Sequence, residues 1–264
     1  MRVRWLVLSF LLILSSSSHL DSQQTATTAP RDPQAVDILK QCLNLAGGVS
    51  TIDAVADYTA SGAITYQLAG KNVAGNVTLH GRGFDQFRMD TSLSTGARSW
   101  LANHGKAKEK AESGDVSDMV GLSLLSPSSL VFPYIQLTEA LRNKSFSIEY
   151  KGLTQLNGAS AHDIRIRRGV ALPDGSIQML EIGAVDILID QSSLRVVLTR
   201  DQARPSRNSA QGPSHELRFS DFRSINNILT PFSISEVIGG QPMWQIQLSK
   251  IDFNLGLADS DFAY

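Results

Sequence analysis

The feature that most constrains this chain is a hydrophobic period of two, which begins near Tyr58 and continues almost to its end. Ile64 and Tyr66, for example, alternate with Thr65 and Gln67. A period of two is typical of a strand with one buried face, and short Gly-rich turns between strands indicate an antiparallel meander. The pattern predicts strands at 58–68, 73–79, 87–90, 98–101, 146–150, 161–167, 180–189, 194–199, 215–223, 228–237 and 244–254.

Two stretches break this pattern with helical spacing. Apolar residues from 35 to 46 recur every 3.6 positions, with Asp32 placed as an N-cap, Pro33 at the first helical position and Gly47 as the stop signal. Between 115 and 144 we expect two short apolar helices, separated by a Ser-Pro break and inserted between two sets of strands.

About ten consecutive antiparallel strands must curl, split or close, because a flat open sheet of that width is unusual. Few helices are available to cover a face. We therefore expect a mainly β (α+β) fold: a strongly curved antiparallel sheet forming an unclosed half-barrel with helices on its concave face. The apolar helices in that concavity either cover a ligand site or form a permanently filled core, and the pattern alone leaves both open.

The N-terminus has the layout of a secretory signal peptide. Two arginines within residues 1–4 precede an apolar run at 5–14 and four serines at 15–18. A run of about ten residues is too short for a membrane-spanning helix. We take 1–29 as signal peptide and flexible leader, and 30–264 as a single domain. A bacterial lipoprotein carries a cysteine directly after such a run, whereas the single cysteine here is Cys42, so we expect a released protein in the periplasm or outside the cell.

Composition and motifs argue against several other functions. The 24 basic and 25 acidic residues give a net charge of −1, which does not favour nucleic-acid binding. The chain has no HExxH, CxxC, G-x-S-x-G or Walker-type sequence.

By alternation His162 and His215 each lie on an apolar strand face, where they could bind a metal or act as a base across a cavity. The simpler alternative is two hydrogen-bonded core histidines. We expect no enzymatic activity, no metal and no cofactor.

Several motifs, in this order, resemble the outer-membrane lipoprotein-sorting carriers (the LolA/LppX-like superfamily) and their secreted relatives. They are LNLAGG at 43–48, YTASG at 58–62, GFDQFRMD at 83–90, DILID at 186–190, FSDFR at 219–223 with LTPF at 229–232, and IDFNLGL at 251–257. The resemblance covers most of the mature chain. It implies an unclosed β-barrel with a helical lid, and its best-known members carry lipoprotein acyl chains across the periplasm.

In the sorting carriers an arginine just before a strand-initial aromatic residue helps to hold the lid closed. Arg82, ahead of Phe87, lies near that place, although Gly83 stands where a proline is typical. The resemblance thus assigns Arg82 a lid-locking role, and the alternative is an ordinary surface arginine.

These observations predict an exported, soluble protein that binds an apolar ligand, a lipid or an acylated protein, in its concave face. We expect a monomer that meets membrane-associated partners transiently. The alternative is a non-catalytic envelope interaction or structural module with a filled concave face. The residues predicted to bind the ligand are Phe87, Trp100, Met119, Leu122, Leu125, Phe132, Tyr134 and Leu137.

Overall fold

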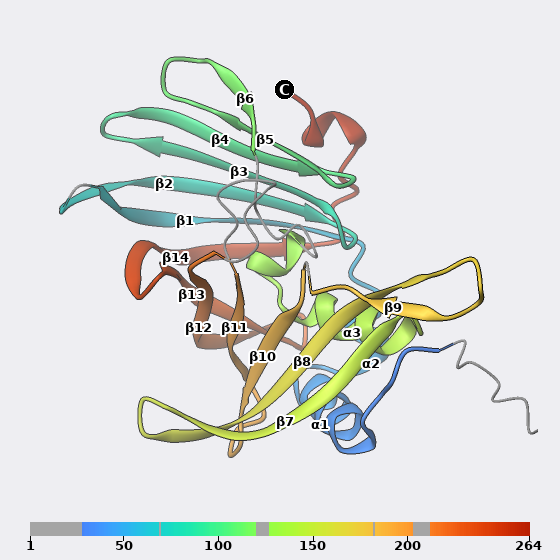
Figure 1. Cartoon of the computed structure of the whole chain (residues 1–264). Coiled ribbons are helices and arrows are strands. Elements are labelled where there is room, and N and C mark those ends of the chain that lie inside the picture. The colour runs from blue at the N-terminus through green and yellow to red at the C-terminus, as the bar shows by residue number, and fades with distance from the viewer. Residues whose placement is uncertain (1–27, 69, 120–126, 182, 203–211) are drawn as a thin grey trace, which may run out of the picture.

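Antiparallel strands dominate the structure, a computed structural model that describes residues 28–68, 70–119, 127–181, 183–202 and 212–264 (Figure 1). Thirteen strands form one sheet in the order β6-β5-β4-β3-β2-β1-β14-β13-β12-β11-β10-β8-β7, and β9 pairs with β8. The strands are β1 (Asp57–Leu68), β2 (Lys71–Arg82), β3 (Gln86–Leu93), β4 (Gly96–Asn103), β5 (Lys106–Lys110), β6 (Val116–Asp118), β7 (Phe146–Leu156), β8 (Ala159–Ala171), β9 (Ile177–Met179), β10 (Val185–Asp190), β11 (Val196–Gln202), β12 (Ser214–Ile225), β13 (Ile228–Ile238) and β14 (Gln241–Phe253).

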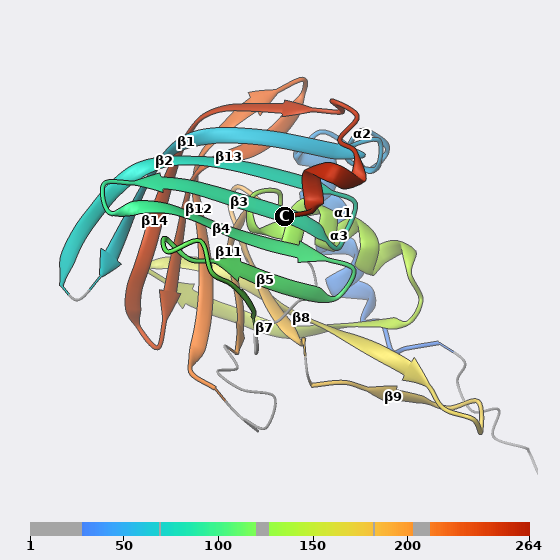
Figure 2. The ribbon, with the colours of Figure 1, turned by 90° about the horizontal axis from the view of Figure 1, so that it is seen from above.

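The sheet curves strongly, so that β1–β5 form one arm and β7–β13 form another (Figures 1 and 2). β6 and β7 stand at opposite ends of the strand order, so the barrel is unclosed. The helices lie on the concave side: α1 (Pro33–Leu45), α2 (Val49–Asp53), the 3₁₀ helix η1 (Pro127–Leu130) and α3 (Tyr134–Arg142). Their apolar residues and those of both arms form one continuous core. The predicted fold class is confirmed.

Helix α1 follows directly from its sequence. The Asp32 carboxylate accepts hydrogen bonds from the backbone N–H groups of Gln34 and Ala35, at 2.8 and 3.1 Å. This satisfies donors that have no partner within the helix. The buried stripe, which includes Leu39 and Cys42, packs into the core. The predicted cap and helix are confirmed.

Other predicted elements need correction. The short helix α2 follows the predicted glycine stop and was not expected, because five residues show too little periodicity. In the segment predicted to hold two helices, η1 and α3 are present, but 116–118 pair with β5 as β6, and 120–126 lie outside the described residues. The strand predicted at 180–189 begins only at Val185. Residues 177–179 instead pair with residues 169–171 at the end of β8 as the short strand β9.

The convex face carries ion pairs around Arg165 and Arg167, which alternate with the buried Ile164 and Ile166 on β8. The Arg165 guanidinium lies 2.9 Å from the Glu181 carboxylate, and Arg167 lies 2.9 Å from Glu181 and 3.1 Å from Glu149. Such exposed pairs contribute little stability each, so burial of the concave side stabilises the fold.

The C-terminal segment (254–264) folds back onto the β2–β5 arm. The buried Asp57 carboxylate accepts hydrogen bonds from the backbone N–H groups of Leu255, Gly256 and Leu257, at 2.7–3.2 Å. Arg82 donates to the Leu257 carbonyl at 2.8 Å and pairs with Asp259. A charged side chain therefore anchors each part of this segment.

The longest helix in the described part of the chain has 13 residues, and none there combines the length and hydropathy needed to cross a membrane.

Candidate functional site

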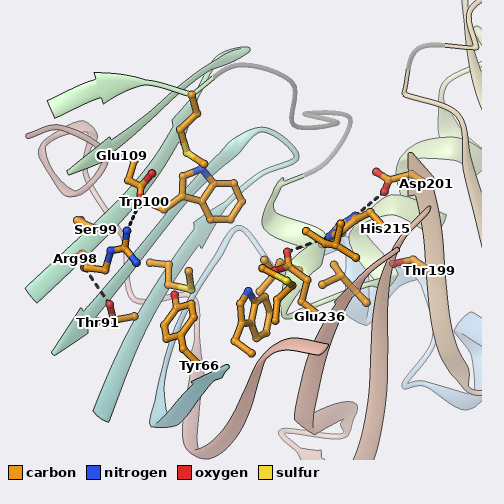
Figure 3. Close-up of a pocket in the computed structure, with 18 of the residues that line it drawn as sticks. Tyr66, Thr91, Arg98, Ser99, Trp100, Glu109, Thr199, Asp201, His215 and Glu236 are labelled. Atoms are coloured by element: carbon orange, nitrogen blue, oxygen red, sulfur yellow. Dashed lines mark hydrogen bonds and ion pairs between the residues drawn. The ribbon is translucent and has the colours of Figure 1, made fainter. Parts of the chain in front are cut away.

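A pocket of about 400 Å³ opens on the concave face, between the two arms of the sheet. Strands β3, β4 and β5 form one wall, and β11, β12 and β13 form the other (Figure 3). Tyr66 on β1 and Trp244 on β14 join the two walls, because these central strands pair with each other at Tyr66↔Trp244. The sheet curvature is thus what brings the two walls face to face.

The lining is mainly apolar and includes adaptable side chains. Methionine is flexible and polarisable, so it suits a pocket that receives ligands of variable shape. The Trp100 ring packs against the ring of the buried Phe87, with ring centroids 4.9 Å apart. The apolar residues that line the pocket are Met89, Trp100, Met119, Leu130, Val185, Leu217, Ile238, Met243 and Trp244.

A charged cluster stands on the β11–β13 wall. His215 Nδ1 lies 2.5 Å from Asp201 Oδ1, and His215 Nε2 lies 3.1 Å from Glu236 Oε1. Asp201 pairs directly with His215 across the strands, while Glu236 is its diagonal neighbour on the next strand. All three side chains are less than one fifth exposed.

The geometry of this cluster specifies its charge. A neutral imidazole has one N–H donor and one acceptor nitrogen, so it cannot donate to two carboxylates. With a carboxylate oxygen at each nitrogen, His215 satisfies both only as the imidazolium. Burial alone would lower the pKa of His215, but the hydrogen bonds and charges of Asp201 and Glu236 outweigh it and raise this pKa to about 10.

The opposite wall holds a second ion pair and two unsatisfied donors. Arg98 Nη2 donates to Glu109 Oε1 at 3.1 Å. Arg98 Nε and Trp100 Nε1 are buried and have no hydrogen-bond partner in the structure. Buried donors without partners cost free energy, and neither of these two nitrogen atoms is exposed to the pocket. Tyr66 lies between the two walls. Its pKa is raised to about 12, mainly because the side chain is buried and to a smaller extent through the neighbouring charges.

The histidine pair considered from the sequence is not assembled. His215 faces the pocket with Leu217, as the alternation predicts. His162 instead has Nδ1 3.0 Å from the Tyr150 hydroxyl and does not line this pocket. Among the described residues, no three His, Cys, Asp or Glu side chains are arranged to hold a metal ion.

The predicted ligand-binding residues fall into three groups. Trp100 and Met119 line the pocket. Leu122 and Leu125 lie outside the described residues. The remaining four are completely buried in the core around the helices: Phe87, Phe132, Tyr134 and Leu137. In this conformation they support the pocket or fill the concave face, and their contact with a ligand stays a prediction.

Arg82, predicted to lock the lid, donates hydrogen bonds to Gln86 and to the Leu257 carbonyl, and it pairs with Asp259. It thus contacts the C-terminal segment in this structure, and its role toward the lid stays a prediction.

Apart from His215, the charged residues of the pocket were missed from the sequence, although one signal was available. By alternation Glu236 shares a strand face with Ile234 and Ile238, so it is an acidic residue on a face that is otherwise apolar. Such an inward charge indicates either a partner or a function. Arg98, two residues before Trp100, gives a similar signal.

Comparisons with solved structures agree with this architecture. A domain assigned to an outer membrane lipoprotein-sorting protein from Vibrio parahaemolyticus matches with a TM-score of 0.53 at 11% identity, covering 87% of this chain and 96% of that one. A LolA superfamily protein from Nitrosomonas europaea matches with a TM-score of 0.54 at 8% identity, covering 87% and 98%.

A DUF1329 family protein from Desulfovibrio piger gives a TM-score of 0.52 at 12% identity, covering 86% and 97%. The chain therefore has the LolA-like lipoprotein-sorting fold. No family model matches the sequence, and no curated protein matches it. At these identities the similarity extends to the fold alone.

Proposed function

We propose that this protein is an exported carrier that binds the apolar chain of a lipid or of an acylated protein on the concave face of its half-barrel. The observation that carries the proposal is the mainly apolar pocket of about 400 Å³ between the two arms of the sheet. This volume is within the usual range for small-molecule sites, and the mixture of apolar walls and a few polar groups is also typical of them.

The expected affinity comes from burial. Each methylene transferred from water into an apolar site contributes about 0.8 kcal/mol, so a chain of a dozen carbons binds without specific polar contacts. The three methionines of the lining allow chains of different shape to be accommodated. The fold of lipoprotein-sorting proteins supports this proposal but does not specify the ligand.

The proposal includes export, the absence of enzymatic activity and a monomeric state. A carrier that moves between membranes must be free of an anchor, and the predicted signal peptide within 1–29 without a following cysteine supports release. The mass of the mature protein, purified from the periplasm and from the medium of its own host, tests both cleavage and location.

The rival function is an interaction or structural module with a filled concave face. It is favoured by the complete burial of four predicted ligand-binding residues, including Phe132 and Leu137. The two functions differ in one measurable respect, which is whether the space beside Trp100 and Trp244 takes up a hydrocarbon chain.

Native mass spectrometry of protein purified from its host, searching for co-purifying lipid, is the first test. The second uses tryptophan fluorescence, because the chain has three tryptophans: Trp5 lies in the predicted signal peptide, and Trp100 and Trp244 both line the pocket. A long-chain alcohol brominated on its chain should quench both. The Trp100→Phe and Trp244→Phe variants each leave one reporter, and each reporter should be quenched. No co-purifying species together with no quenching would support the filled module instead.

A further inference from the structure

The polar groups of the pocket carry information about the ligand beyond its apolar chain. Of the described residues that line the pocket, five have ionisable acidic or basic side chains other than tyrosine: Arg98, Glu109, Asp201, His215 and Glu236. They belong to two groups on opposite walls, and the two groups differ in net charge.

The β4–β5 group is balanced. Arg98 and Glu109 carry opposite charges and are joined by a hydrogen bond of 3.1 Å. Both side chains are about one third exposed, so solvent screens the electric field of this ion pair. This wall does not present a net charge to a ligand.

The β11–β13 group is not balanced. One imidazolium stands between two carboxylates, so the group holds one net negative charge. Side-chain exposures of 18% for His215, 14% for Asp201 and 16% for Glu236 leave little solvent to screen it. Each carboxylate contacts His215 through one of its two oxygens. A buried net charge beside an apolar surface is costly unless an opposite charge accompanies it.

We infer that the pocket selects amphiphiles whose polar group carries a protonated amine, which the Asp201–His215–Glu236 cluster binds through its net negative charge. The inference rests on the proposed function, because the apolar chain of the same ligand must occupy the pocket.

The structure argues for an amine rather than a carboxylate or phosphate. An anionic group placed at the β11–β13 wall would meet a net negative charge at low dielectric. An anionic group at Arg98 would have to compete with Glu109, which already accepts a hydrogen bond from that guanidinium. An ammonium group meets neither obstacle, and its three donors match carboxylate oxygens.

The test compares three probes with one chain length: dodecylamine, dodecanol and dodecanoate, titrated below micelle formation at pH 7 and followed by the fluorescence of Trp100 and Trp244. Dodecylamine should bind about tenfold or more tightly than dodecanol, which corresponds to one charge-assisted hydrogen bond, and dodecanoate should bind weakest. In Glu236→Gln the cluster becomes neutral, so the preference for the amine should fall about tenfold while dodecanol affinity stays within twofold.

Glu216→Gln is the matched control, because Glu216 lies on β12 beside His215 but pairs with Arg200 and Arg218 outside the pocket lining. It should keep the full preference for dodecylamine. Asp201→Asn is a second variant that neutralises the cluster, and a thermal melt of each variant checks that it folds.

The outcomes separate the two proposals. If none of the three probes binds, the carrier function itself fails. If all three bind with similar affinity, or if dodecanoate binds best, the carrier function stands and the amine selection is overturned. A preference for dodecylamine that Glu236→Gln and Asp201→Asn leave intact also overturns it, because the preference would then come from the outer surface.

Discussion

The stability of this protein should depend on pH through His215. The folded state raises the pKa of this side chain from about 6.5 to about 10. A raised pKa means that folding favours the protonated form. The stabilisation is therefore fully present below about pH 6.5 and is lost progressively as the pH rises to about 10.

The magnitude follows from that interval. Each pH unit between the unfolded and the folded pKa changes the free energy of unfolding by about 1.4 kcal/mol, which gives a total of about 4 to 5 kcal/mol. Domains are stable by only about 5–15 kcal/mol, so the loss of this one proton should remove a substantial part of the free energy of unfolding. Burial of the cluster supports an effect of this order, because solvent does little to screen its charges.

Urea unfolding at pH 6, 7, 8 and 9 measures this dependence in wild type and in His215→Gln. The difference between the two proteins matters most, because other groups titrate equally in both. Burial raises the pKa of Cys42 to about 12, for example, and this thiol opposes folding above pH 9 in either protein. We expect wild type to lose about 1 kcal/mol per pH unit between 7 and 9 relative to His215→Gln. Equal slopes in wild type and His215→Gln would refute a charged His215.

Two further substitutions test the packing of the sheet and of the C-terminal segment. Gly62→Ala should lower the free energy of unfolding by about 1–3 kcal/mol, because the new Cβ would lie 2.2 Å from the backbone carbonyl oxygen of Gln247; a change below 0.5 kcal/mol in urea unfolding would contradict this. Arg82→Ala removes the contacts to Leu257 and Asp259, so hydrogen exchange in the C-terminal segment should accelerate while probe affinity stays within twofold. A large change in probe affinity would instead support the lid-locking role.

Much of the fold could be predicted because its determinants are local. Alternation along each strand and the cap at Asp32 act within a few residues of the chain, so they are visible in the sequence. The misplaced start of the strand at Val185 and the missed β9 have a different cause. Residues 177–179 become a strand by pairing with the end of β8, and that pairing depends on how far the β8 hairpin extends.

The pocket could be predicted only in part for the same reason. Trp100 and Met119, which line the pocket, were candidates because they are large apolar side chains near the predicted lid. The sequence also placed His215 on an apolar face, but not its partners, because Asp201 and Glu236 are separated from it by 14 and 21 residues in the sequence. Nothing in their spacing indicates that they meet.

What brings this cluster together is the register of three strands. Asp201 stands opposite His215, and Leu217 stands opposite Glu236, which places Glu236 diagonally beside the imidazole. A shift of one residue in either pairing would turn one carboxylate to the convex face and leave His215 with only one of its two counter-charges. The apolar residues in the same strands oppose that shift, because it would expose them as well. The strand register that buries the apolar core therefore also places the three charged side chains together in the pocket. A substitution that weakens the pairing of β11, β12 and β13 should impair folding and ligand selection together.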